Sequence, residues 1–139
     1  MPASIKILVA DDSPDDRFIL ERALRKTGLP VEIFEVEDGQ EAIEFLSQRG
    51  RFGDPEQFPW PDLLLLDLKM PGYNGFDVLS WIQQHPGPRP LKTIVLSGSE
   101  MKADIQQAQA LGAVAYTTKP PAPEQLRDLI ATQIRSDKP

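Results

Sequence analysis

Five short apolar runs alternate with segments of helical hydrophobic periodicity along this chain. The runs are rich in leucine or β-branched residues and too short to be helices, so they are predicted strands, at residues 5–10, 31–36, 63–67, 93–97 and 114–117. The periodic segments are predicted helices, at about residues 14–27, 39–50, 75–84, 100–111 and 123–135. The alternation therefore predicts five successive strand–helix units, (βα)5.

The third apolar run contains four consecutive leucines, Leu63 to Leu66. A strand with one solvent-facing side would alternate apolar and polar residues, so this run indicates a strand that is covered on both faces. Such strands are typical of parallel sheets between two helix layers, in which the crossover connections are right-handed. The predicted fold is α/β: a doubly wound, flavodoxin-like sheet of five parallel strands with helices on both faces.

The length of the chain is that of a single domain. Its 139 residues, 40% of them hydrophobic, can form one sizeable core but not two, so we expect one domain over residues 1–139 with its core at about 5–135. Residues 51–61 form a loop longer than the ~2–6 residues usual between a helix and a strand. Its aromatic residues are expected to pack within the protein, and the proline-rich residues 85–90 predict a stiff connector.

Composition excludes several kinds of site. Because the chain has no cysteine and one histidine, a metal would have to be bound by oxygen ligands. The net charge of -6 argues against binding to nucleic acid. The sequence has no leader, no lipidation motif and no apolar stretch of the ~18 residues that span a membrane, so we expect a cytoplasmic protein that binds neither membrane nor nucleic acid.

Four carboxylates follow the first predicted strand, in the sequence VADDSPDD. Ser13 is a typical helix N-cap, and Pro14 suits the first helical position. Asp15 and Asp16 would then lie in the first turn, where acidic side chains interact favourably with the helix dipole. These two residues are therefore interpreted as helix-starting residues without a further function.

Asp11 and Asp12 precede this cap and gain nothing from it. On their own they are more typical of a solvated turn than of a site, but Asp67 follows the leucine run of another predicted strand. The carboxyl ends of parallel strands meet at one edge of a sheet, where three carboxylates would repel one another, and Mg²⁺ would relieve that repulsion. Ser97 and Lys119 end two further strands and would add a hydroxyl and a cation. Together these groups indicate a phosphoryl-transfer pocket.

Over essentially the whole chain, these residues resemble the receiver domain of two-component response regulators. The resemblance implies that Asp67, in the pattern D-x-x-M-P-G, accepts the phosphoryl group. It also implies that Asp11 and Asp12 hold Mg²⁺, Asp12 directly and Asp11 through water. The other implied roles are a metal ligand in the main-chain carbonyl of Lys69, a switch hydroxyl on Ser97 with the small Gly98 beside it, an aromatic switch in Tyr116, and a phosphate-binding Lys119 before a cis Pro120.

The resemblance implies a phosphoacceptor that receives its phosphoryl group from a histidine kinase and signals by altered protein contacts. Such a protein catalyses only its own phosphorylation and dephosphorylation. The long loop, the length of the chain and the DDSPDD opening are similar to the small regulators paired with bacterial phytochrome kinases. Because the last helix uses the chain to about residue 135, we expect a stand-alone receiver, which could form a homodimer through residues 100–111, 114–117 and 123–135.

Other interpretations are compatible with single motifs. Ser97 could cap the following predicted helix, since it begins the sequence SGSE. Tyr116 and Lys119 alone would be an ordinary strand aromatic and a surface lysine. His85 does not indicate a Ser-His-Asp hydrolase, because the chain has no G-x-S-x-G motif. For the whole protein, a phosphorylation-independent interaction module with the same fold is the alternative. A phosphatase or phosphotransferase acting on outside substrates would lack a recognisable substrate domain.

Overall fold

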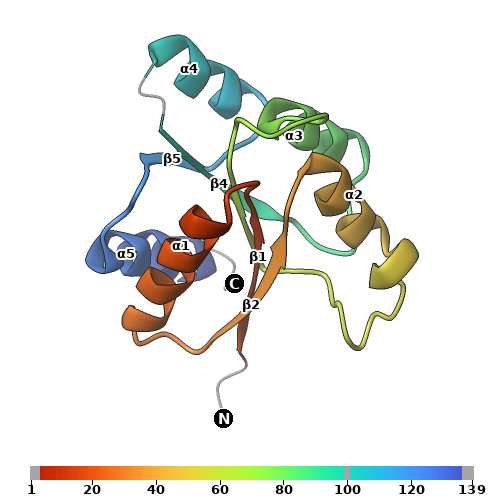
Figure 1. Ribbon diagram of the computed structural model, residues 1–139, viewed down its shortest axis with the longest axis horizontal. Coiled ribbons are helices and arrows are strands. Elements are labelled where there is room, and N and C mark those ends of the chain that lie inside the picture. The colour runs from red at the N-terminus through yellow and green to blue at the C-terminus, as the bar shows by residue number, and fades with distance from the viewer. Residues whose placement is uncertain (1–3, 99–100, 136–139) are drawn as a thin grey trace.

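The computed structural model describes residues 4–98 and 101–135. Within these residues, five strands alternate strictly with five α-helices, and one short 3₁₀ helix follows the second of them; Figure 1 shows their arrangement. In chain order the elements are β1 (Ile5–Ala10), α1 (Pro14–Lys26), β2 (Val31–Val36), α2 (Gly39–Ser47), η1 (Gly50–Phe52), β3 (Leu63–Leu66), α3 (Gly75–Gln84), β4 (Lys92–Ser97), α4 (Lys102–Ala110), β5 (Ala115–Thr118) and α5 (Pro123–Arg135). In this described part of the chain, no helix has the length and apolar character needed to cross a membrane.

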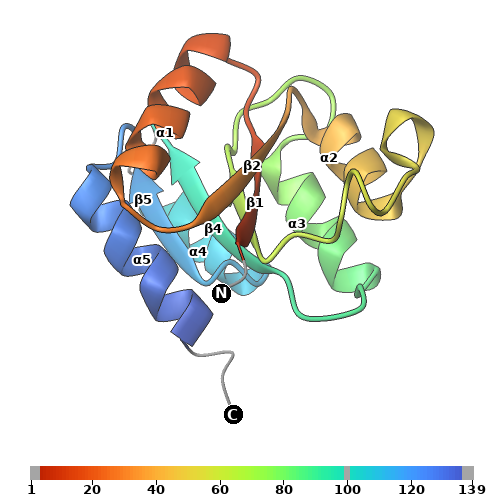
Figure 2. The same ribbon diagram turned by 90° about the horizontal axis from the view of Figure 1, so that it is seen from below.

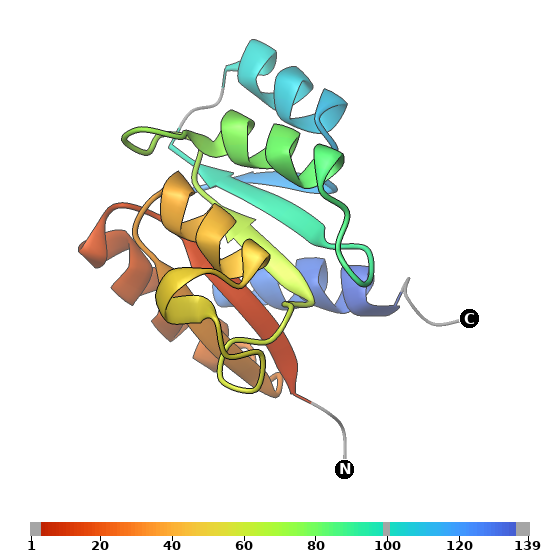
Figure 3. The ribbon, with the colours of Figure 1, turned by 90° about the vertical axis from the view of Figure 1, so that its right-hand side faces the viewer.

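The predicted (βα)5 arrangement is confirmed. All strand pairs are parallel, and the strand order is β2-β1-β3-β4-β5. This is the flavodoxin-like order, in which ligands bind outside the carboxyl ends of the strands where the order reverses, here between β1 and β3. Helices α1 and α5 lie side by side on one face of the sheet (Figure 2). Helices α2, α3 and α4 cover the other face (Figure 3).

The four leucines of β3 explain why helices are needed on both faces. Leu63 and Leu65 pack with α1 and α5, whereas Leu64 and Leu66 pack with α2 and α3. All four side chains are at most 1% exposed. A strand alternates its side chains between the two faces of a sheet, so an uninterrupted apolar run requires a core on each side.

Strand β3 is also held by polar contacts at both of its ends. At its start, the Asp62 amide donates to the Lys6 carbonyl at 2.8 Å, and the Lys6 amide donates to the Asp62 carboxylate at 2.8 Å. At its end, the Asp67 amide donates to the Ala10 carbonyl at 3.0 Å. The carboxyl ends of β1 and β3 are thereby brought next to each other.

The aromatic residues of the long loop before β3 pack within the protein, as predicted. Phe52 is 2% exposed, and its ring centroid lies 5.2 Å from that of Phe45 and 5.1 Å from that of Phe58. Trp60 packs against the proline-rich connector, where a Cβ added to Gly87 would lie 2.3 Å from the indole ring. The two irregular segments of the chain are thus packed against each other.

Helix α2 ends at Ser47, three residues before its predicted end. Gln48 adopts a left-handed conformation with φ of 56° and terminates the helix, while its amide bonds back to the carbonyls of Glu44 and Phe45. Gly50 then begins η1. Hydrophobic periodicity did not reveal this stop, because a left-handed Gln is uncommon and has no strong sequence signal.

Candidate functional site

The candidate site is built at the carboxyl ends of β1 and β3. Asp11 follows β1 and is 3% exposed, while Asp67 follows β3 and is 6% exposed. Asp12 is exposed. One carboxylate oxygen of each residue lies within 4.8 Å of the others, and we call these three residues the acidic triad. The topology of the sheet, rather than proximity in sequence, therefore brings Asp67 to the pair.

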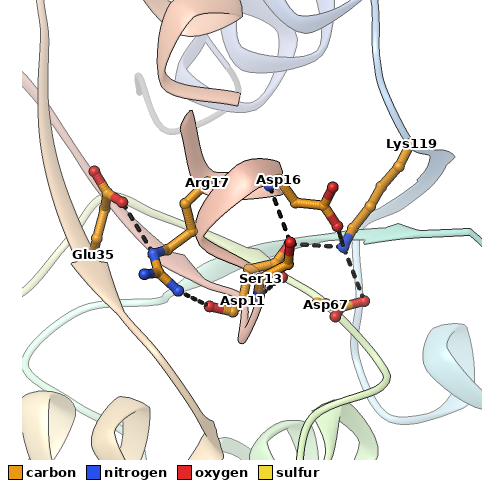
Figure 4. Close-up of polar contacts among 7 residues, drawn as sticks. All are labelled: Asp11, Ser13, Asp16, Arg17, Glu35, Asp67 and Lys119. Carbon is orange, nitrogen blue, oxygen red and sulfur yellow. Dashed lines mark hydrogen bonds and ion pairs between the residues drawn. The ribbon is translucent and has the colours of Figure 1, made fainter. Parts of the chain in front are cut away.

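Lys119 brings a cation to the triad from the loop after β5. Its ammonium nitrogen lies 2.7 Å from Asp11 Oδ2, 3.0 Å from Asp16 Oδ2 and 3.4 Å from Asp67 Oδ1 (Figure 4). The Lys119 amide donates to the Ser97 carbonyl at 3.0 Å, which fixes this loop against the end of β4. The peptide bond from Lys119 to the following proline is cis.

Burial and charge shift the pKa of two groups in the site. Burial raises the pKa of the Asp67 carboxyl and Asp11 adds repulsion, while the Lys119 ammonium only partly offsets both effects. Burial alone would lower the pKa of Lys119, but its hydrogen bonds to Asp11 and Asp16 outweigh this and raise it above its ordinary value. Lys119 is therefore charged at neutral pH, and one ammonium faces several carboxylates. This imbalance suits a bound cation.

The residues of the site surround a cavity of about 410 Å³. Its lining includes most of the residues that the sequence proposed: Asp11, Asp67, Lys69, Ser97, Gly98, Lys119 and Pro120. The Lys69 amide also donates a hydrogen bond to the Asp67 carboxylate. Tyr116 does not line this cavity. It is half-buried in β5 and packs against the core on the α2 to α4 face of the sheet.

Ser97 is the last residue of β4 and is 1% exposed. Helix α4 begins at Lys102, and its N-cap is Met101. Ser97 is therefore not the cap of this helix, because it lies too far from the first helical turn. The rest of the proposed SGSE cap, at residues 99 and 100, lies outside the described residues.

Asp16 lies in the first turn of α1, as predicted, but its carboxylate also makes a contact that the prediction did not include. Ser13 caps α1 as predicted, with its Oγ accepting from the Asp16 amide at 3.2 Å. The reciprocal bond of a capping box is not made by Asp16, because the Ser13 amide donates to Asp11 Oδ1 at 2.9 Å instead. Asp11 thus takes part in the turn after all, and the Asp16 carboxylate points to Lys119. No sequence signal separates these two uses of an acid at this position.

Arg17 is a second residue whose role the sequence did not indicate. Its Nη1 donates to the Asp11 carbonyl at 2.6 Å, and its Nε lies 3.2 Å from Glu35 Oε1 on β2 (Figure 4). Burial and repulsion from Glu21 raise the pKa of Glu35, and Arg17 opposes that rise. Arg17 therefore connects the backbone at Asp11, just after β1, to the neighbouring strand β2.

Comparison with known proteins gives a consistent result. Residues 7–131 match the family model of the response regulator receiver domain. The response regulator Rcp1 of Synechocystis sp. is 33% identical over 118 residues, which make up 85% of this chain and 78% of that protein. In further curated relatives the match is a smaller part of a longer protein, 16% of one and 27% of another.

Two solved structures share the fold and a similar level of identity. The phosphorylated cyanobacterial phytochrome response regulator RcpA superposes with a TM-score of 0.78 and is 32% identical, covering 94% of this chain and 91% of that one. The Mn²⁺-bound form of response regulator Rcp1 superposes with a TM-score of 0.74 and is 30% identical, covering 95% of this chain and 92% of that one. Both are response regulators, one phosphorylated and one with a bound divalent metal.

Proposed function

Because the chain belongs to the response regulator receiver domain family, we propose that Asp67 accepts a phosphoryl group from a histidine kinase. One observation carries this proposal. The Asp67 carboxylate, buried at the end of β3, lies 3.4 Å from the Lys119 ammonium and within the acidic triad. A nucleophilic carboxylate beside a fixed positive charge is the arrangement that phosphoryl transfer requires.

In the proposed reaction, a carboxylate oxygen of Asp67 attacks the phosphorus of the donor. A new oxygen–phosphorus bond forms as the bond from phosphorus to the donor breaks, and the leaving group departs with that electron pair. Lys119 stabilises the negative charge on the transferred oxygens. Hydrolysis of the acyl phosphate restores the carboxylate, so the protein catalyses only its own phosphorylation and dephosphorylation.

The site also fits Mg²⁺, because its donor set consists of oxygen atoms and carries excess negative charge. We propose that Asp11, Asp12, Asp67 and the main-chain carbonyl of Lys69 would hold the ion. When bound, Mg²⁺ supplies positive charge beside the oxygens of the phosphoryl group. The Mn²⁺-bound form of Rcp1 supports a divalent metal at such a site.

We propose that Ser97 and Tyr116 convert phosphorylation into a change of protein surface. The buried Ser97 hydroxyl and the adjacent Gly98 line the cavity beside Asp67, so a new phosphoryl group would be within their reach. Tyr116 precedes Lys119 by three residues on the same strand and loop. The half-buried Tyr116 can therefore respond to a movement of β4 or of the loop after β5.

The protein contacts that carry the signal are a further part of the proposal. RcpA is a phytochrome response regulator, which supports a phytochrome-type histidine kinase as the donor. Met101 and Val114 are 65% and 44% exposed, and these apolar side chains support a homodimer through α4, β5 and α5.

The test is the mass of the intact protein after incubation with a small phosphodonor and Mg²⁺. We expect one phosphoryl adduct on the wild type, and no adduct on Asp67→Asn or in the presence of a chelator. Asp15→Asn, an exposed acid outside the cavity, serves as the control and should be labelled normally. An unmodified wild type that still binds Mg²⁺ would favour the phosphorylation-independent interaction module.

A further inference from the structure

Asp16 shares the Lys119 ammonium with the acidic triad, although it belongs neither to the triad nor to the residues expected to bind phosphate. We propose that Asp16 is a positioning residue that competes with the phosphoryl group for Lys119 and thereby slows phosphorylation. This inference rests on the proposed function of Asp67.

The geometry places the Lys119 ammonium closer to Asp16 than to Asp67. Its nitrogen is 3.0 Å from the Asp16 carboxylate but 3.4 Å from that of Asp67. An ammonium has three N–H groups, and here two of them are donated, to Asp11 at 2.7 Å and to Asp16. Lys119 is thus held mainly by its two other partners while Asp67 is unmodified.

The competition with Asp16 differs from that with Asp11. Asp11 is in the triad, so a bound cation would offset its charge. Within residues 4–98 and 101–135, Asp16 is the ion-pair partner of Lys119 that lies outside the triad, and its charge would persist. To stabilise the transferred oxygens, Lys119 must give up part of its interaction with Asp16.

The Asp16–Lys119 pair contributes little to stability, so its main effect would be on the chemistry. The Asp16 side chain is 41% exposed and that of Lys119 is 19% exposed. Exposed ion pairs contribute little because water screens them and ordering the side chains costs entropy. The capping of α1 depends on the Asp16 amide and the Ser13 hydroxyl, which a change of the Asp16 side chain leaves intact.

The test compares rate constants for phosphorylation by a small phosphodonor at saturating Mg²⁺. We expect Asp16→Asn to be phosphorylated about fivefold faster than the wild type, equivalent to ~1 kcal/mol at 1.4 kcal/mol per tenfold change. Asp16→Glu should return toward the wild-type rate because it restores the charge. The matched control is Asp15→Asn, which removes the same charge from the same helical turn but does not line the cavity and should leave the rate unchanged.

A second measurement tests whether Asp16 acts through Lys119. In a double-mutant cycle of Asp16→Asn and Lys119→Gln, read on the rate constant of phosphorylation, we expect Asp16→Asn to accelerate the reaction in the wild type but not in Lys119→Gln, so that the two changes are non-additive. Additive changes would overturn the inference, as would Asp16→Asn being phosphorylated no faster than the wild type. If the wild type is not phosphorylated at all, the proposed function fails and this inference fails with it. If the wild type and Asp16→Asn are both phosphorylated, but at equal rates, the inference about Asp16 fails and the proposed function of Asp67 stands.

Discussion

At the scale of single residues, the buried charges of the site raise the free energy of the folded state, and the rest of the fold must offset this. Asp67 is buried beside Asp11, and Lys119 is shared among three carboxylates. Desolvation and repulsion together disfavour the charged form of Asp67 more than Lys119 favours it, which raises its pKa. Without a cation, the ionised site therefore opposes folding.

This cost predicts the effect of Asp67→Asn on stability in a chelator. A carboxyl whose pKa is raised by folding stabilises the protein below its unfolded pKa and loses that contribution as the pH rises through its folded pKa. We therefore expect Asp67→Asn to melt at a higher temperature than the wild type at neutral pH. The difference should shrink as the pH falls through the raised pKa of the folded protein toward the ordinary aspartate value of about 4. Thermal unfolding across this pH range checks both points, and a less stable Asp67→Asn at neutral pH would contradict them.

At the scale of elements, two contacts outside the cavity keep the site in place. Arg17 on α1 joins the Asp11 carbonyl to Glu35 on β2. The long loop and the proline-rich connector pack together through Trp60 and Gly87 near the start of β3, at the other end of the strand from the site. The first contact orients the backbone at Asp11. The second packs Trp60 against the core on the α2 to α4 face of the sheet.

Replacing Arg17 with Met should weaken Mg²⁺ binding roughly tenfold, as is typical when a group that orients a metal ligand is lost. The apolar stem of the side chain is kept, but the bond to the Asp11 carbonyl and the ion pair with Glu35 are lost. Titration with Mg²⁺, followed by thermal shift or calorimetry, measures the affinity. Arg25→Met is the control, because among the residues that the structure describes Arg25 forms its ion pair with Glu21, at the exposed surface of the same helix. A similar loss in both variants would mean that Arg17 does not act through Asp11.

Gly87→Ala should destabilise the protein by about 1–3 kcal/mol, the usual range for overpacking. The added Cβ would lie 2.3 Å from the Trp60 ring, which cannot move aside without disturbing the loop. Gly53→Ala tests the specificity of this effect, because there the nearest atom is 3.4 Å away and φ is -72°. Denaturant unfolding of the two variants should separate them clearly. Equal stabilities would show that the indole ring has room to shift.

Elements with a strong local signal were predicted well, and contacts set by tertiary structure were not. The leucines of β3 predicted a doubly covered strand because any strand with that pattern needs two cores. Asp11 and Asp67 could be expected to meet because topology fixes where strands end. The partners of Asp16 and Arg17 depend on side-chain directions across separate elements, which residue patterns do not encode. The left-handed end of α2 was missed for a different reason, because Gln48 carries no strong sequence signal for that backbone conformation.

At the scale of the whole molecule, metal binding and folding are linked. The triad joins residues from β1 and β3, so a cation bound there can contact its ligands only when the sheet is formed. A ligand that binds only the folded state stabilises it by an amount that depends on its concentration relative to Kd. Removal of the metal should therefore lower the free energy of unfolding of the whole domain.

Saturating Mg²⁺ should raise the free energy of unfolding by about 2.7 kcal/mol when the free ion is at about 100 times its Kd. Chelation should reverse the effect. Denaturant titrations with and without Mg²⁺ give the difference, and the Asp12→Asn variant should show a much smaller rise because it lacks an exposed carboxylate of the triad. An equal rise in Asp12→Asn would place the ion elsewhere on the surface.

Because the four residues of β3 are all leucines, hydrophobic burial specifies the register of this strand only weakly. If this strand slipped by one residue against its neighbours, leucines would still occupy three of the four strand positions, so hydrophobic burial distinguishes the two alignments less sharply than it would for an alternating strand. Such a slip would displace Asp67 by about 3.3 Å along the strand. The polar bonds of Asp62 with Lys6 and of the Asp67 amide with Ala10 exist in only one alignment. The half-buried Asp62, just before the start of the strand, therefore helps to determine the position of the Asp67 carboxylate.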